Sequence, residues 1–139
     1  MTETVKSVMP KIGTFVDTQP FWDAARERRL VLQYCRDTGR FQHYPRPVSV
    51  YTGSRNLEWR EVSGEGTVFA CTIMRVPSPG YAGPLPCAVA TIELREGVRI
   101  IARIVDCEPE AVTIGMRVRL AWEELGETHY PVFRPVGAP

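Results

Sequence analysis

Four residues of this chain have the spacing of a zinc site made of two C-x-x-C pairs, yet they retain a single thiol. They are Cys35, Thr38, Ser49 and Thr52. Thiolates hold structural zinc in tetrahedral geometry, and neutral hydroxyl groups do not replace them as ligands. The sequence therefore predicts the hairpin frame of a metal site without metal binding, and no zinc is expected.

The residues around these positions keep the form of such a frame. Gly39 follows the first pair, residues 44–47 (YPRP) precede the second, and Gly53-Ser54 follows it. Without metal, two short hairpins have little core of their own. We predict that aromatic side chains replace the metal clamp, because each buries a large area. These aromatic residues are Tyr34, Phe41, Tyr44 and Tyr51.

No other group of residues meets the requirements of catalysis. His43 and His129 stand outside any ligand-spaced group, and residues 63–66 (SGEG) are typical of a strand bend, not of a nucleophile elbow or phosphate loop. The four cysteines form no C-x-x-C pair and are expected to be free thiols. Nothing assembles a nucleophile, a base and an oxyanion site, so no catalytic residue is expected.

Composition limits the class of protein. The chain has 139 residues, 44% of them hydrophobic, and a net charge of +1. This apolar content is ordinary for a folded domain, and the balanced charge predicts neither a nucleic-acid footprint nor a membrane patch. No apolar run is long enough to span a bilayer, and residues 1–19 lack the apolar core of a signal peptide. We expect a cytoplasmic protein.

The pattern predicts a mainly β chain in three parts. Residues 1–17 are expected to be a tail or docked arm, residues 18–56 a helix and the degenerate ribbon, and residues 57–139 a barrel. The helix is expected to begin near Thr18, and Gly64 and Gly66 to bend the first barrel strand. Alternating apolar residues predict five or six barrel strands, with a short turn or helix late in the chain, which is the OB architecture. The expected strands cover 30–35, 41–44, 67–76, 87–94, 98–105 and 116–123, with an edge strand at 130–134.

Three further motifs support a resemblance. They are Pro20-Phe21-Trp22, residues 59–68 (WREVSGEGTV) and residues 114–118 (IGMRV). In their order and spacing, over roughly residues 20 to 136, they resemble a family of small bacterial and archaeal proteins. That family has a rubredoxin-like zinc ribbon followed by an OB-fold, and its members accompany thiolases, thiolase-like aldolases and related acyl-CoA enzymes. The chain departs from the family pattern at three of the four ribbon cysteines.

The resemblance implies a non-catalytic accessory subunit that helps to shape the acyl-CoA channel of a thiolase-like partner in lipid or steroid metabolism. Trp22, together with Tyr81 and Leu85 in the Pro-rich loop 77–86, is then expected to contact the partner. Four arginines are candidates for contacts with CoA phosphates through forked hydrogen bonds. They are Arg46, Arg75, Arg99 and Arg103.

Three alternatives stay open. The first is a stand-alone acyl-CoA or acyl-carrier binding protein that passes ligand between enzymes. The second is a single-stranded nucleic-acid binder, because OB barrels carry basic and aromatic platforms. The third is an acyltransferase that uses Cys71, Cys87 or Cys107. The sequence does not specify the acyl chain, nor whether the partner is a thiolase or an aldolase.

Overall fold

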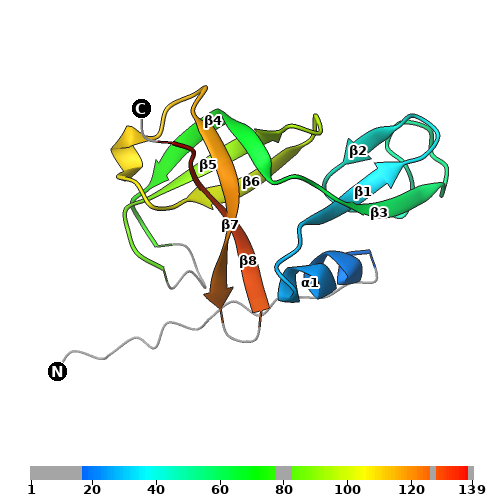
Figure 1. The fold of residues 1–139 in the computed structure, drawn as a ribbon, viewed down its shortest axis with the longest axis horizontal. Helices are drawn as coiled ribbons and strands as arrows, with labels where there is room; N and C mark the ends of the chain where they lie inside the picture. The colour runs from blue at the N-terminus through cyan, green and yellow to red at the C-terminus, as the bar shows by residue number, and fades with distance from the viewer. Residues whose placement is uncertain (1–16, 78–82, 126–127, 138–139) are drawn as a thin grey trace.

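The structure is a computed structural model and describes residues 17–77, 83–125 and 128–137. A helix and a three-stranded sheet precede a barrel, and the two sheets lie side by side with α1 below the smaller one (Figure 1). Among the described residues the elements are α1 (Gln19–Arg26), β1 (Val31–Cys35), β2 (Arg40–Gln42), β3 (Leu57–Glu61), β4 (Glu65–Met74), β5 (Cys87–Leu94), β6 (Arg99–Ile104), η1 (Pro109–Ala111), β7 (Arg117–Leu125) and β8 (Thr128–Pro135).

Helix α1 starts where the sequence predicts. Thr18 is the residue before the first turn, and proline stands inside that turn, where its missing N–H has no helical acceptor to lose. The helix ends at Arg26, because Arg28 adopts a left-handed conformation with φ of 59°. Its buried face carries Phe21, Ala24 and Ala25 and packs on β1 and β8.

The smaller sheet has the strand order β2-β1-β3, with antiparallel pairing throughout. The hairpin expected over residues 30–44 is present as β1 and β2. Residues 57–61, which the sequence assigns to the barrel, instead form β3 and pair with β1. The smaller sheet therefore extends past residue 56, the predicted boundary between ribbon and barrel, because β3 forms its backbone hydrogen bonds with β1.

The five remaining strands close a barrel in the order β4-β5-β6-β8-β7, which confirms the expected fold class. Inward-facing residues of β6 alternate as predicted, and Ile100 and Ile104 are buried. Gly64 has φ of 79°, and a Cβ there would lie 2.6 Å from Leu120 Cβ. A Cβ on Gly66 would lie 2.5 Å from a methyl group of Ile92. The two glycines thus allow the close approach of Leu120 and Ile92 to the start of β4.

The prediction that residues 130–134 form an edge strand is wrong. Strand β8 lies between β7 and β6, and Phe133, opposite Ile104 of β6, is fully buried. Pairing with β6 is confined to this end of β8, so Pro131 lies in a part of the strand that pairs with β7 alone. The barrel closes through pairing between residues that are far apart in the chain, and a local sequence pattern does not predict such pairing.

A single hydrophobic cluster runs from α1 through the smaller sheet into the barrel. Phe21, Leu32 and Val62 belong to it together with the barrel residues, and Val62 N donates to Leu30 O at 2.9 Å. The ribbon and the barrel are therefore held against each other by shared packing. None of the described helices is long and apolar enough to cross a membrane.

Candidate functional site at the junction of ribbon and barrel

At the former metal positions, Ser49 replaces the metal as the partner of Cys35. Ser49 Oγ donates to Cys35 Sγ at 3.1 Å and accepts hydrogen bonds from the backbone N–H groups of Tyr51 (3.1 Å) and Thr52 (3.4 Å). Both Cys35 and Ser49 are buried. Hydrogen bonds from the hydroxyls of Ser49 and Thr38 lower the pKa of the Cys35 thiol to about 7, against the opposing effect of burial.

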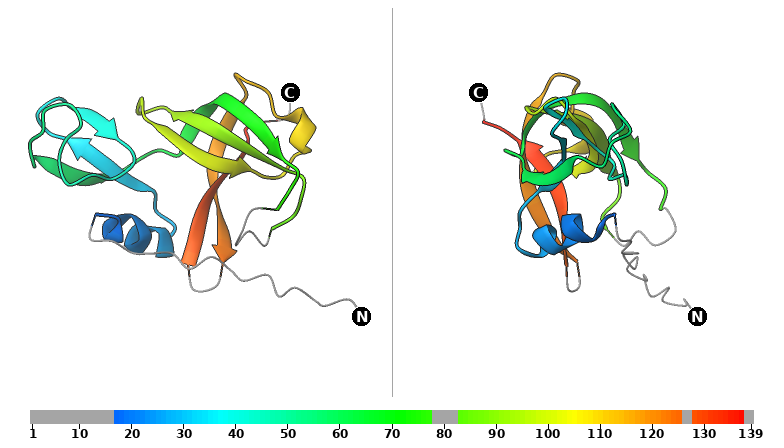
Figure 2. Two further views of the ribbon diagram at one scale, coloured as in Figure 1. Left: turned by 180° about the vertical axis from the view of Figure 1, so that it is seen from behind. Right: turned by 90° about the vertical axis from the view of Figure 1, so that its right-hand side faces the viewer.

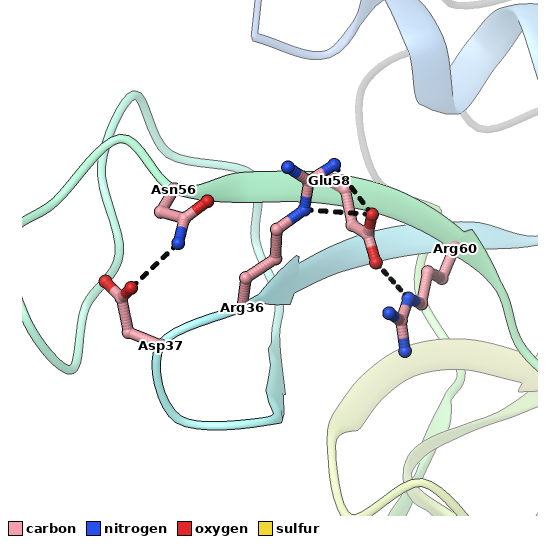
Figure 3. A network of polar contacts seen from close by, with 5 residues as sticks. All are labelled: Arg36, Asp37, Asn56, Glu58 and Arg60. Atoms are coloured by element: carbon pink, nitrogen blue, oxygen red, sulfur yellow. Dashed lines mark hydrogen bonds and ion pairs between the residues drawn. The ribbon is translucent and has the colours of Figure 1, made fainter.

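A second set of hydrogen bonds, on the outside of the ribbon, ties its two turns together. Asp37 accepts from Ser54 Oγ at 2.5 Å, from Asn56 Nδ2 at 2.8 Å and from Thr52 Oγ1 at 3.3 Å. These donors lower the pKa of the Asp37 carboxyl, Ser54 most strongly. Figure 3 shows Asp37 and Asn56 beside a neighbouring ion-pair network, in which Glu58 of β3 joins two arginines.

The interior of the ribbon is held by two buried amides. Gln42 Nε2 donates to Gln33 Oε1 at 2.7 Å, and this same oxygen accepts from Arg46 N at 2.8 Å. Gln33 Nε2 donates to Arg46 O at 2.9 Å, and Gln42 Oε1 accepts from Val50 N at 2.9 Å. The amides thereby fasten the loop of the second half-site to the hairpin, and satisfied buried polar groups favour one conformation.

Sequence reasoning missed this amide clamp, although a signal was present. Counting outward from the four-residue turn at 36–39 pairs Gln33 with Gln42 across the hairpin, as the register shows. Of the aromatic residues expected to form the clamp, Phe41 is partly buried against the core, whereas Tyr44 and Tyr51 are exposed. Tyr34 and Phe41 rings meet at 5.1 Å, and Tyr51 Oη donates to Phe41 O at 2.7 Å. Tyr44 is 56% exposed and contributes little burial.

A groove of about 380 Å³ lies where the ribbon meets the barrel. The turn between β5 and β6 extends toward the ribbon in Figure 1 and in the reverse view of Figure 2. One wall comes from the ribbon, from β2 and the loop that follows it, and carries Tyr44, Arg46 and Tyr51. The other wall comes from the barrel and carries Glu93 and Arg99.

His43 also lines this groove. Its ring lies 6.0 Å from the Phe21 ring and 4.3 Å from the Tyr44 ring, between centroids. Burial lowers the pKa of His43 to about 4, so the imidazole is neutral at neutral pH. Its Nδ1 atom is buried and has no hydrogen-bond partner within the described part of the chain.

Comparison with known proteins identifies the family. Residues 22–58 match the family described as the ChsH2 rubredoxin-like zinc ribbon domain, and residues 59–123 match the ChsH2 C-terminal OB-fold domain. A DUF35 domain-containing scaffold protein of Pyrococcus furiosus is 32% identical, over 84% of this chain and 85% of its own length. The chain belongs to the DUF35 (ChsH2-type) family. The resemblance inferred from the sequence is thereby confirmed.

This DUF35 chain is also similar to part of a larger protein and to the whole of a chain in a solved structure. A probable enoyl-CoA hydratase alpha subunit of Thermomonospora curvata is 35% identical over 94% of this chain, but the match spans 41% of that relative. A chain of the solved structure named Ltp2-ChsH2(DUF35) aldolase is 34% identical with a TM-score of 0.83, covering 91% of this chain and 100% of that chain. The whole solved chain therefore corresponds to this one.

The ribbon of this DUF35 chain does not fit zinc, although the family description names a zinc ribbon. Only Cys35 supplies a thiol, and the hydroxyl of Ser49 is engaged with that thiol and with two backbone N–H groups. Thr52 Oγ1 is engaged with Asp37. Among the described residues, no three His, Cys, Asp or Glu side chains gather as a metal site. The absence of zinc stays a prediction for metal analysis.

The fold brings together two of the four arginines proposed to bind phosphate. Arg46 and Arg99 line the same groove from opposite walls. Arg75 lies elsewhere, with its Nη2 atom 3.8 Å from a carboxylate oxygen of Glu110. Arg103 is largely buried in an ion pair with Glu123. The sequence did not distinguish these environments, because the acidic partners of Arg75 and Arg103 come from other segments of the chain.

The residues expected to contact a partner have different environments. Trp22 is partly buried, and its ring meets the Tyr130 ring of β8 edge-on with 5.3 Å between centroids. The contacts of this ring are therefore with residues of the same chain. Leu85 is half-buried just before β5. Tyr81 lies outside the described residues. Contact of any of the three with a partner stays a prediction.

The described thiols do not form a catalytic group. Cys35 and Cys87 are buried, and Cys71 is exposed with its Sγ 3.8 Å from the Val112 carbonyl oxygen. Burial, Asp106 and Glu108 together raise the pKa of the Cys107 thiol, which disfavours the reactive thiolate. The geometry therefore adds no nucleophile to the groove.

Proposed function

We propose that this chain is a non-catalytic accessory subunit of a thiolase-like acyl-CoA enzyme. The observation that carries the proposal is the match to a chain of the solved structure named Ltp2-ChsH2(DUF35) aldolase, which is covered over its whole length at 34% identity and a TM-score of 0.83. The scaffold names of the archaeal relatives, which this chain matches over 85% and 77% of their lengths, support the same role. The partner performs the chemistry, a retro-aldol or Claisen step on a CoA thioester.

The site supports binding better than catalysis. The groove at the junction has cationic and aromatic side chains, yet the described residues that line it include no cysteine or serine nucleophile. Its only histidine, His43, is packed against aromatic rings and held neutral. A nucleophile, a base and a charge-stabilising site must converge for acyl chemistry, and the described residues that line this groove do not bring them together.

The hydratase names of two relatives do not transfer an activity to this chain. The matched region spans 41% of the Thermomonospora curvata protein and 33% of the 3-oxo-4,17-pregnadiene-20-carboxyl-CoA hydratase alpha subunit of Mycobacterium tuberculosis. A hydratase activity can reside in the remainder of those proteins. We infer that this chain corresponds to their accessory portion and that its partner acts on a bulky, steroid-like or other lipid acyl-CoA.

The test is to capture the tagged full-length chain with its native partner, identify that partner by mass spectrometry, and assay both on CoA thioesters. We expect a stoichiometric thiolase-fold protein whose cleavage or condensation activity requires this chain. Replacing Cys71 and Cys107 with serine should leave the activity of the complex unchanged. A chain that is active alone, or a complex inactivated by the serine variants, would contradict the non-catalytic assignment.

A second candidate is a stand-alone acyl-CoA or acyl-carrier binding protein, and the groove itself is the observation that favours it. Its volume of about 380 Å³ falls in the range of small-molecule sites. Calorimetry on the isolated chain distinguishes the two roles. Micromolar binding of an acyl-CoA without any partner would favour the carrier, and binding that requires the partner would favour a shared site.

A further inference from the structure

The loop of the second half-site, residues 44–51, presents an apolar surface to solvent. Four of its side chains are large, hydrophobic and exposed. They are Tyr44, Val48, Val50 and Tyr51, and Val50 is the most exposed of them at 60%. Tyr44, Val50 and Tyr51 line the same groove, so these side chains lie together. Exposed apolar side chains that gather in one place, and are not scattered singly, mark a surface that a partner covers.

Hydrogen bonds hold the backbone of this loop from inside the ribbon. Gln42 Nε2 donates to Val48 O at 3.2 Å, and Gln42 Oε1 accepts from Val50 N at 2.9 Å. Ser49 N donates to Ser54 O at 2.8 Å, which closes the turn that follows. None of these bonds uses an exposed apolar side chain. A loop that is fixed before binding loses little conformational entropy when a partner docks on it.

Positive charge borders this apolar surface. Residues 38–57 include three arginines and no acidic residue, although the whole chain has a net charge of only +1. The guanidinium carbon of Arg40 lies 4.2 Å from the centre of the Tyr51 ring, and Arg46 lines the groove with the exposed tyrosines. Neither arginine forms an ion pair with an acidic group in the part of the chain that the structure describes. Glu93, the one acidic residue among those that line the groove, belongs to the barrel wall.

The composition of the loop favours a protein as its partner. Tyrosine and arginine are enriched at protein interfaces, and lysine, which is depleted there, is absent from residues 38–57. We propose that the loop of residues 44–51 is the docking surface for the thiolase-like partner, which covers it with an apolar hollow rimmed by acidic side chains. This inference rests on the proposed function and assigns the partner contact to the ribbon. The frame of the lost metal site then has a use without metal, because the buried amides fix the shape of the docking loop.

The first test measures binding of the full-length chain to the purified thiolase-fold partner by biolayer interferometry. Val50→Asp puts a charge into the apolar surface and should weaken binding at least about thirtyfold, mainly through faster dissociation. Ile114→Asp is the matched control, because Ile114 is 72% exposed and is not among the residues that line the groove. It should bind as the parent chain does. Both variants should keep the denaturation midpoint of the parent chain, since neither side chain is buried.

The second test measures the charge at the rim of the surface. Arg40→Gln and Arg46→Gln should each slow association about threefold at low salt, because charges at an interface rim steer the encounter. The difference should disappear at high salt, which screens exposed charges. Arg75→Gln is the matched control, since Arg75 lies outside the groove and pairs with Glu110. Association that does not depend on salt would overturn the acidic character assigned to the partner surface.

Failure of this inference and failure of the proposed function give different results. If Val50→Asp and the arginine variants bind the thiolase-fold partner as the parent chain does, the docking surface is overturned and the accessory role stands. If the parent chain and Ile114→Asp capture an acidic protein of another class, and Val50→Asp does not, the proposed function fails and the docking surface stands. A parent chain that captures no protein overturns both.

Two other occupants of the loop have readouts of their own. Sedimentation of the parent chain as a dimer and of Val50→Asp as a monomer would assign the loop to a second copy of this chain. Co-sedimentation of the parent chain with vesicles of anionic phospholipid, lost in Val50→Asp, would assign it to a membrane surface. Either result overturns the assignment to the enzyme partner.

Discussion

Protonation of His43 is expected to destabilise the fold as the pH falls. The ring is packed between Phe21 and Tyr44, and burial lowers its pKa from the ordinary value of 6.5 to about 4. Between these values the unfolded chain binds a proton that the folded chain does not bind, so the free energy of unfolding decreases as the pH falls through this window. At about 1.36 kcal/mol for each pKa unit, the full loss is about 3 kcal/mol.

Urea denaturation between about pH 7 and pH 4.5 measures this loss, and most of it is expected within that window. The carboxyls of Asp37 and Glu58, whose pKa values are also lowered by their partners, lose their stabilising effect at more acidic pH. The informative quantity is therefore the difference between the parent chain and His43→Phe. That variant keeps an aromatic ring in the site and removes the titrating group.

We expect His43→Phe to show a nearly flat pH dependence over this window, while the matched control His129→Gln keeps the slope of the parent chain. Parallel curves for the parent chain and His43→Phe would refute the reasoning. They would show that the imidazole is solvated in the folded state, and that its buried position against Phe21 is not maintained.

Three further perturbations test the clamp, the barrel bend and the former metal positions. Gln42→Leu leaves Val50 N without its acceptor and should lower the free energy of unfolding by about 1–3 kcal/mol in chemical denaturation. Gly64→Ala places a Cβ 2.6 Å from Leu120 Cβ. A left-handed conformation costs about 1–2 kcal/mol by itself, and the decrease in the free energy of unfolding should exceed this cost. Restoring cysteine at all three substituted half-site positions should create stoichiometric zinc binding, measured by elemental analysis, if the ribbon keeps its geometry. These positions are Thr38, Ser49 and Thr52.

Each of these has a result that would contradict it. An unchanged midpoint for Gln42→Leu would mean that water satisfies the freed groups and that the amide pair is not a clamp. Gly53→Ala is the control for Gly64→Ala, because Gly53 also has a positive φ but no atom lies within 4 Å of a Cβ placed there. Equal losses in the two alanine variants would remove the steric argument. Zinc uptake by the unaltered chain would contradict the expectation that a single thiol cannot retain the metal.

Local patterns determined most of the elements of this protein. Alternation of apolar residues over 98–105 and 116–123 corresponds to β6 and β7. Successive side chains of a strand point to opposite faces, so a strand with one buried face has an apolar residue at every second position. Gly64 and Gly66 stand where the chain passes so close to Leu120 and Ile92 that a Cβ does not fit, and the bend expected there stays a prediction. The loss of three ribbon thiols was also evident from the sequence, because ligand chemistry depends on residue type and spacing.

Tertiary structure decided what no local pattern contains. Strand β8 closes the barrel because Phe133 pairs with Ile104 of β6. Strand β3 belongs to the ribbon sheet because it pairs with β1. Long-range contacts likewise distinguish arginines that look equivalent in sequence. Arg103 is neutralised by Glu123, whereas Arg46 and Arg99 face one groove from two parts of the fold. Residue type determines which interactions a side chain can make, and only the folded chain determines which partners come within reach.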